Sequence, residues 1–177
     1  MHGNRVVAMH LIGSHGPTYF QRYPRDKAFF KPDCPRADIE NCSVEQIVNT
    51  YDNTIRYTDL VLAETINKLK ALESQYNTAL IYVSDHGESL GENGLFLHGM
   101  PYGLAPDFQK RVPLLMWLSS GFKQVKQINT DCLSNEAQKA GQYSHDNVFH
   151  SLLGVMDVQT QAYDGKLDIF KDCRTTS

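Results

Sequence analysis

The sequence lacks the features that mark several common classes of protein. Its 17 Lys and Arg are outnumbered by 20 Asp and Glu, for a formal net charge of −3, and no basic cluster suggests nucleic-acid binding. No apolar run is long enough to span a bilayer, and the first residues do not read as a secretory signal. The phosphate-binding patterns and the GxSxG nucleophile turn are also missing. The 177 residues suffice for one domain with its own core.

The four cysteines leave two interpretations open. Cys34 and Cys42 flank a polar loop, and their spacing does not match a zinc-binding CxxC pair. A disulfide across this loop would contribute about 2–3 kcal/mol, but two separate thiols in a reducing compartment fit the sequence equally well. Cys132 and Cys173 can form a second bridge, with weaker support.

The apolar pattern predicts an α/β fold with a largely parallel sheet and right-handed crossovers. A capping-box pattern, Ser43 with Gln46, predicts a helix that ends near residues 74–77. Ser144 is the expected cap of a last helix that runs to about Val155. One face of the first helix should carry Ile47, Tyr51, Ile55, Leu62, Ile66 and Leu69. The predicted strands are residues 5–13, buried on both faces, then 79–84 and 112–118.

The adjacent pair Asp85–His86 follows the second predicted strand and is the strongest candidate for metal binding. A carboxylate and an imidazole beside Gly87, which permits a sharp turn, suit a divalent ion such as zinc. In the alternative interpretation Asp85 caps a loop and His86 packs against it. Because ligands bind beyond the carboxyl ends of strands in open α/β sheets, His15 should lie at the same edge.

The remaining polar candidates are ambiguous on their own. His98, in a glycine- and proline-shaped loop, can return to the metal site, although a lone loop histidine is more often a surface residue. Glu88 can orient a ligand imidazole, meet a cationic group of a substrate, or lie in solvent. His10 is expected to be a core histidine, and His145 and His150 are expected to be ordinary residues of the last helix.

Four segments in the same order resemble a known family. The sequence resembles the phosphoethanolamine transferases of the alkaline-phosphatase/sulfatase superfamily, in particular the lipid A enzymes that include the mobile colistin-resistance group. The run DHGESLGENG with the LHG that follows it is the most specific part. The segments are residues 12–19 (IGSHGPTY), 49–54 (NTYDNT), 84–93 (SDHGESLGEN) and 97–102 (LHGMPY).

The resemblance implies an alkaline-phosphatase/sulfatase-like sheet flanked by helices and a zinc-dependent site. It implies that Asp85 and His86 are zinc ligands. It also implies that His15 and His98 are catalytic and substrate-binding residues that line the phosphoryl site or hold a second zinc ion. Glu88 falls near the ethanolamine or metal region. Cys34 and Cys42 match a periplasmic disulfide of the family, whereas the resemblance says less about Cys132 and Cys173.

The family's activity is transfer of phosphoethanolamine from phosphatidylethanolamine to a lipid A phosphate or another envelope glycan. Its members lie at the periplasmic face of the bacterial inner membrane, and the modification gives resistance to polymyxin and colistin. Its threonine nucleophile and a glutamate zinc ligand precede the segment matched by residues 12–19, and Thr18, Thr50 and Thr54 do not match that nucleophile.

Residues 1–177 are therefore expected to be the C-terminal portion of a catalytic domain, without the upstream half of that domain or the membrane region. We expect this portion to be inactive alone, and to aggregate or depend on a partner segment, because apolar faces and sheet edges would be uncovered. The alternatives are a sulfatase or phosphodiesterase of the same superfamily, or a remnant module without catalytic activity.

Overall fold

The computed structural model describes residues 3–139 and 141–175, and the chain forms two compact units. The first, here called the histidine unit, comprises Val7–Lys68 and Tyr82–Leu114. The second, here called the C-terminal unit, comprises Met1–Val6, Leu69–Ile81 and Leu115–Ser177. Among the described residues, no helix combines the length and the apolar character needed to cross a membrane.

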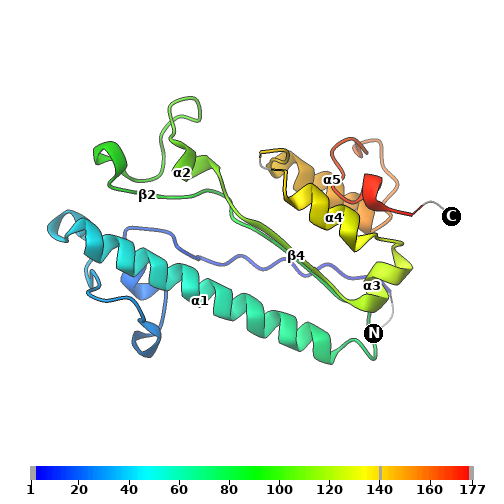
Figure 1. Cartoon of the computed structure of the whole chain (residues 1–177), viewed down its shortest axis with the longest axis horizontal. Helices are drawn as coiled ribbons and strands as arrows, with labels where there is room; N and C mark the ends of the chain where they lie inside the picture. Colours follow the sequence, from blue (N-terminus) through cyan, green and yellow to red (C-terminus); the bar gives the residue numbers. More distant parts are fainter. Residues whose placement is uncertain (1–2, 140, 176–177) are drawn as a thin grey trace. The chain divides into compact units, whose positions relative to one another are not determined.

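Figure 1 labels the α-helices and the strands β2 and β4. The long helix α1 and the strands β1 and β4 each run from one unit into the other. The α-helices are α1 (Val44–Ala71), α2 (Asp107–Lys110), α3 (Ser120–Val125), α4 (Thr130–Ala137) and α5 (His145–Val155). The strands are β1 (Ala79–Val83), β2 (Ser89–Leu90), β3 (Phe96–Leu97) and β4 (Leu114–Leu118). Short 3-10 turns cover Tyr19–Gln21, Arg25–Lys27, Ile39–Asn41, Glu92–Gly94 and Lys171–Cys173.

Local capping signals place the starts of α1 and α5 as predicted. The Ser43 hydroxyl accepts a hydrogen bond from the Gln46 N–H at 3.2 Å, and the Gln46 amide oxygen accepts one from the Ser43 N–H at 2.9 Å. Ser144 and Asn147 form the same reciprocal box at the start of α5. Such boxes satisfy N–H groups that a helix leaves unpaired at its first turn. Helix α1 ends at Ala71, a few residues before the predicted end.

The sheet differs from the prediction. Strands β1 and β4 pair, and the hydrogen bonds at their ends run in opposite order: Ser84 N–H donates to Pro113 O, and Ser119 N–H donates to Thr78 O. This order makes the pair antiparallel. Because β2 and β3 are antiparallel as well, the predicted parallel sheet does not occur in the described part of the chain. The chain between β1 and β4 turns back through the β2–β3 hairpin, so no crossover connects them.

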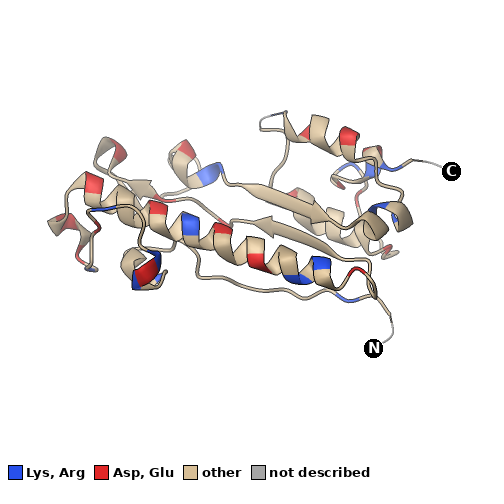
Figure 2. Ribbon diagram, turned by 60° about the horizontal axis from the view of Figure 1, so that its bottom comes forward, with Lys and Arg blue, Asp and Glu red and all other residues tan. Residues whose placement is uncertain are grey.

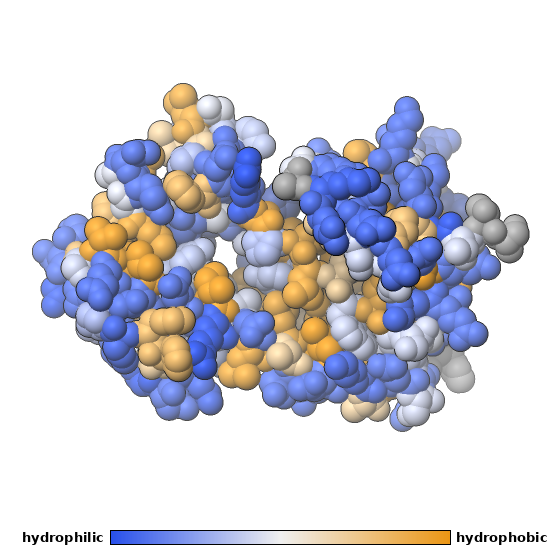
Figure 3. Space-filling model, viewed as in Figure 1, coloured by the Kyte–Doolittle hydropathy of each residue, from blue (hydrophilic) through white to orange (hydrophobic). Residues whose placement is uncertain are grey.

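The predicted first strand is wrong. Residues 4–11 pair with no strand within residues 3–139 and 141–175. Val7 is 78% exposed and Met9 is 65% exposed, and the predicted core residue His10 is exposed too. Apolar, β-branched sequence favours an extended backbone, but a strand needs a partner for its hydrogen bonds. Figure 3 shows apolar side chains reaching the surface on the face that it draws.

The histidine unit has a small core closed by a disulfide. Tyr19, Cys34, Ile39 and Ile47 are buried together, and Cys34 is bonded to Cys42 as the resemblance implied. Leu90 and Leu97 of the hairpin pack against this cluster. The core therefore joins the loop before α1, the first turns of α1 and the β2–β3 hairpin.

The buried face of α1 is largely polar. Its buried residues are Ile47, Thr50, Asn53 and Thr54, whereas Ile55 of the predicted apolar face is 48% exposed. The Asn53 carboxamide oxygen accepts hydrogen bonds from the N–H groups of Phe29 and Phe30 at 2.7 and 2.8 Å. These contacts provide hydrogen-bond partners for backbone N–H groups of an irregular segment, which lacks the regular backbone hydrogen bonds of a helix or strand. Figure 2 shows the Lys, Arg, Asp and Glu residues distributed along the same helix.

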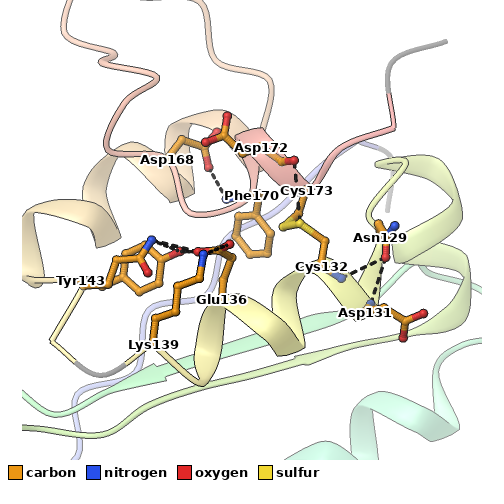
Figure 4. Close-up of a disulfide and its surroundings, with 11 residues drawn as sticks. Asn129, Asp131, Cys132, Glu136, Lys139, Tyr143, Asp168, Phe170, Asp172 and Cys173 are labelled. Atoms are coloured by element: carbon orange, nitrogen blue, oxygen red, sulfur yellow. Dashed lines mark hydrogen bonds and ion pairs between the residues drawn. A yellow bond between two sulfur atoms is a disulfide. The ribbon is translucent and has the colours of Figure 1, made fainter.

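The C-terminal unit has a more apolar core. Ile128, Val155 and Phe170 are its buried residues, and side chains from β4, α3 and α4 pack against them. Figure 4 shows Phe170 beside the disulfide between Cys132 of α4 and Cys173. The Asn129 side chain caps α4 by accepting hydrogen bonds from the N–H groups at positions 131 and 132. Both disulfides named in the sequence are therefore present.

Candidate metal centre

Three imidazoles from three separate loops converge in the histidine unit. One ring nitrogen from each of His15, His86 and His98 lies within 4.8 Å of the other two. The ring centroids are 4.0 Å apart for His86 and His98, 4.8 Å for His15 and His98, and 5.8 Å for His15 and His86. Imidazole nitrogen is a common ligand of zinc and other transition metals. The convergence confirms that His15, His86 and His98 share one location.

A tight turn presents His15. The His15 N–H donates to Ile12 O at 3.2 Å, and Gly13 within the turn has a φ of +55°, which favours glycine. The Thr54 hydroxyl on α1 lies 2.6 Å from the Ser14 hydroxyl and ties the turn to the helix. The Arg22 Nε–H donates to His15 O at 3.0 Å. The backbone of this histidine is therefore held from both sides.

His86 lies three residues past the end of β1, and Gly87 lets a neighbouring backbone segment approach closely. A Cβ atom at position 87 would lie only 1.9 Å from the Phe108 carbonyl oxygen, so no other residue fits without a backbone shift. The Gly87 N–H donates to Gln109 O at 3.0 Å, and the Ser84 hydroxyl donates to His86 O at 2.8 Å. Position 87 therefore requires glycine because of the close approach of the two backbones.

The β2–β3 hairpin returns the chain so that His98 reaches His86. Ser89 pairs with Leu97 in this hairpin. The buried Gln109 side chain donates to the Ser89 hydroxyl at 2.9 Å and to Leu97 O at 3.2 Å, which fixes both strands of the hairpin from one side. His98 follows β3 directly and therefore depends on this pairing for its position.

Each imidazole uses its Nδ1 atom in a hydrogen bond to an oxygen. Nδ1 of His15 lies 2.7 Å from Gly16 O, and Nδ1 of His86 lies 2.9 Å from Gly87 O. A carbonyl oxygen can only accept, so Nδ1 carries the proton in both rings. Nδ1 of His98 lies 3.1 Å from a carboxylate oxygen of Glu88. In a neutral ring this arrangement leaves Nε2 with the lone pair, as ligation of a metal requires.

Asp85 lies at the solvent side of this cluster. Its side chain is 80% exposed, and Oδ2 lies 3.8 Å from Nε2 of His86. Two ligand atoms of one tetrahedral zinc ion are separated by about 3.3 Å, because zinc–ligand distances are about 2.0–2.2 Å. Only a small side-chain movement separates this carboxylate and His86 from joint ligation. The other Asp85 oxygen accepts a hydrogen bond from the His86 N–H at 3.0 Å.

Glu88 is buried beneath the imidazoles. Its side chain is 2% exposed, and Oε1 accepts hydrogen bonds from the Gly16 N–H and from His98, both at 3.1 Å. The nearby Tyr19 is 1% exposed. Burial, and then the negative charge of Glu88, raise the pKa of the Tyr19 phenol, so this hydroxyl keeps its proton at physiological pH.

The donor set fits a zinc ion. Three imidazoles with free Nε2 atoms and one flexible carboxylate are typical zinc ligands, and each ring has an oxygen acceptor on its second nitrogen. His10 lies in the same unit but outside the cluster, and His145 and His150 belong to α5 in the C-terminal unit.

Sequence reasoning missed the residues that hold the site in place. Tyr19, Thr54 and Gln109 are all buried and contact the turns or the hairpin that present the histidines. The one available signal was the spacing of Thr50 and Thr54, which lie four residues apart on the same helical face as Ile47. Polar residues at core positions of a helix indicate contacts with backbone groups elsewhere.

Comparison with known proteins gives the class to which this site belongs. The sulfatase family matches residues 2–158, so the chain belongs to the sulfatase family. Within that family its similarity lies with the phosphoethanolamine transferases. It is 48% identical to phosphoethanolamine transferase EptA of Escherichia coli K12, over 100% of this chain and 32% of that protein. Identity to phosphatidylethanolamine transferase Mcr-1 of Escherichia coli is 37%, over 86% of this chain and 26% of that protein.

The chain also resembles solved structures of phosphoethanolamine transferase domains. The soluble domain of lipooligosaccharide phosphoethanolamine transferase A from Neisseria meningitidis superposes with a TM-score of 0.88 at 43% identity, over 93% of this chain and 49% of that domain. The C-terminal periplasmic domain of EptC from Campylobacter jejuni gives 0.80 at 41% identity, over 93% of this chain and 51% of that domain. The chain thus spans about a third of the curated EptA sequences and about half of these domains.

Proposed function

We propose that this chain contributes the histidine side of the active site of a zinc-dependent phosphoethanolamine transferase. The observation that carries the proposal is the convergence of His15, His86 and His98, each with its Nδ1 atom bound to an oxygen. The donor would be phosphatidylethanolamine and the acceptor a lipid A phosphate or another envelope glycan. The names of the relatives support both substrates.

We assign the zinc ligands within this chain to Asp85 and His86. The 3.8 Å separation of their ligand atoms supports this pairing, since only a side-chain rotation is needed. When bound, the ion would supply positive charge that polarises a phosphoryl oxygen and favours the deprotonated nucleophile. The solvent exposure of Asp85 leaves this carboxylate free to turn toward an ion.

His15 and His98 then act on the phosphoryl group. A neutral Nε2 atom accepts a proton, and a protonated one donates a hydrogen bond to a phosphoryl or leaving oxygen. Their rings are 4.8 Å apart, so both can approach one phosphate. Either role is compatible with one zinc ion, or with two if His15 and His98 hold the second.

We assign the nucleophile to none of the three threonines in the matched segments. The Thr50 hydroxyl lies 2.6 Å from both Gln46 O and the Cys34 N–H, and the Thr54 hydroxyl lies 2.6 Å from the Ser14 hydroxyl. The Thr18 hydroxyl accepts a hydrogen bond from Arg22 at 2.8 Å. These structural contacts support a nucleophile from the family's upstream half. Its oxygen would attack the phosphorus of phosphatidylethanolamine with diacylglycerol as the leaving group, and the acceptor phosphate would then take the phosphoethanolamine group and free the nucleophile.

The two disulfides support an oxidising location, the periplasmic face of the bacterial inner membrane. An N-terminal membrane region is part of this proposal, because one relative of solved structure is described as an integral membrane protein. Such a location brings the site to phosphatidylethanolamine and to lipid A. Modified lipid A would carry less negative charge, which weakens its attraction for cationic peptides such as colistin.

The first experiment measures zinc content and phosphoethanolamine transfer. The 177-residue chain and a polypeptide that also carries an upstream half are compared, each with His86→Ala and with His10→Ala as the matched control. We expect stoichiometric zinc and transfer to lipid A only in the longer polypeptide, both abolished by His86→Ala and kept by His10→Ala. Tight zinc binding and turnover by the 177 residues alone would refute the split site.

A hydrolase is the second candidate, favoured by the match to the sulfatase family as a whole. It would use water in place of a lipid acceptor. Release of free phosphoethanolamine or sulfate without labelling of lipid A would support it.

A non-catalytic remnant is the third candidate. The large exposed apolar side chains of residues 6–12 favour it for these residues taken alone. Absence of zinc and of any turnover, even with the upstream half, would support this third candidate.

A further inference from the structure

Three buried side-chain atoms in the histidine unit have no hydrogen-bond partner among the described residues. One of the three, Oδ2 of Asp33, lies 3.5 Å from the Arg25 guanidinium. The other two are the Tyr19 hydroxyl and the Oε2 atom of Glu88. One is a donor and the other an acceptor, and burial, followed by the charge of Glu88, raises the pKa of the Tyr19 phenol. A buried polar group without a partner destabilises the folded state, so a mutual contact would remove two such costs together.

The other oxygen of Glu88 already has a defined task. Oε1 accepts from the backbone N–H of Gly16 and from Nδ1 of His98. The orientation of the carboxylate therefore decides the direction in which His98 presents Nε2. With only Oε1 bound, the carboxylate can still rotate about its last bond.

Tyr19 is held where it can stop this rotation. A Cβ atom built at Gly16 would lie 2.6 Å from the Tyr19 hydroxyl, so the hydroxyl lies against the residue whose N–H already contacts Glu88. The ring packs edge-to-face against Tyr51 with centroids 5.6 Å apart, in the cluster closed by the Cys34–Cys42 disulfide. A side chain packed in this way keeps one rotamer.

We propose that Tyr19 is a positioning residue, whose hydroxyl donates to Oε2 of Glu88 and so fixes the carboxylate that holds Nδ1–H of His98. The inference deepens the proposed function and rests on it, because it concerns a histidine assigned to the phosphoryl site. Outer hydrogen bonds of this kind fix the tautomer and the direction of a functional imidazole. Tyr19 lies one step further out than Glu88 and acts only through it.

The test uses Tyr19→Phe, which keeps the ring and removes the donor. Tyr23→Phe is the matched control, because Tyr23 is a buried tyrosine of the same unit whose hydroxyl contacts Asn53. The readout is the 15N chemical shifts of the His98 imidazole in the metal-free protein. We expect a predominantly Nδ1–H ring in the wild type and in Tyr23→Phe, and a mixture of tautomers in Tyr19→Phe. Glu88→Gln sets the maximum change.

A second readout connects the residue to zinc. Outer-shell substitutions weaken metal binding by about 10–100-fold, and we expect Tyr19→Phe to reach the lower end of that range, about tenfold, with thermal stability close to that of Tyr23→Phe. Unchanged His98 shifts in Tyr19→Phe would overturn the inference, as would equal shifts in both variants. Because the shifts are measured without metal, they test the role of Tyr19 even where the proposed zinc chemistry fails.

Discussion

The two units are stabilised in different ways. The C-terminal unit buries Ile128, Val155 and Phe170 in one apolar cluster with contributions from strands and helices. The histidine unit has more irregular chain, and single polar side chains such as Asn53 and Gln109 hold its loops through two or more hydrogen bonds. A scaffold of this second kind positions loops precisely, and each of its contacts depends on a particular side chain. The three clustered histidines, His15, His86 and His98, lie on the loops of the unit that is held in this way.

Truncation of the apolar core gives the largest expected effect. Phe170 is fully buried, so Phe170→Ala should lower the free energy of unfolding by about 3–5 kcal/mol. The single tryptophan, Trp117, lies in β4 of the C-terminal unit and reports its urea unfolding by fluorescence. Phe149→Ala, at a residue that is 52% exposed, is the control and should cost far less. Equal losses would contradict an apolar core centred on Phe170.

The disulfides should rank next. Cys132 and Cys173 are 41 residues apart and Cys34 and Cys42 are 8 apart. The loop-entropy relation gives about 4 kcal/mol for the first bridge and about 2.5 kcal/mol for the second. Double Cys→Ser variants of each pair, compared by urea unfolding, check the order. We expect the zinc affinity to fall only when the Cys34–Cys42 bridge is removed, because it closes the core around Tyr19.

Loss of the Asn53 carboxamide, which holds the loop at Phe29 and Phe30, tests the histidine unit directly. Asn53→Ala leaves the N–H groups of Phe29 and Phe30 without their acceptor, so about 2–3 kcal/mol should be lost. Faster amide hydrogen exchange at these positions would report the change locally. The control Asn49→Ala removes one exposed contact to Pro32 O and should have little effect. Normal protection in Asn53→Ala would show that packing alone orders the loop.

The smallest effect at neutral pH concerns Tyr163 in the C-terminal unit. Burial, followed by the hydrogen bond to Asp168 and its charge, raises the pKa of Tyr163 to about 12, although Arg174 opposes the shift. The folded state therefore binds this proton more tightly than the unfolded state. Its contribution to stability is complete below about pH 10 and is lost as the pH rises toward about 12. Tyr163→Phe should therefore lower the stability by a small, constant amount below about pH 10 and flatten the profile between about pH 10 and about pH 12.

The parts of the fold that depend on residues close together in the sequence could be predicted from the sequence alone. The capping boxes at Ser43 and Ser144 mark the starts of α1 and α5 because each donor and acceptor lies within three residues. Strand β1 has the β-branched composition that its burial requires. The segment of residues 5–13 has the same composition, but a strand also needs a partner, and composition cannot supply one.

Prediction of the site is limited in the same way, because the contacts between distant segments could not be read from local sequence. The meeting of His15 with His86 was predicted from the edge of a parallel sheet, whereas the β2–β3 hairpin and the α1 contacts bring the histidines together. The residue types were therefore sufficient to predict that the histidines cluster, but they did not predict the path of the chain that brings them together. Tyr19 gave no signal, since a tyrosine before a proline-rich loop is ordinary. Its importance appears only when Glu88, 69 positions later, lies beside it.

Gly87 and Gly103 belong to one glycine-rich stretch, and they predict opposite outcomes in a saturation-mutagenesis library. At position 87 the Phe108 carbonyl occupies the space of any side chain, so selection for folded protein should return a single amino acid. At position 103 no atom lies within 4 Å of a built Cβ, so nearly every codon should survive. The glycine content of this stretch therefore overstates how much of it is constrained, and the constraint is concentrated at the codon that follows the Asp85–His86 pair.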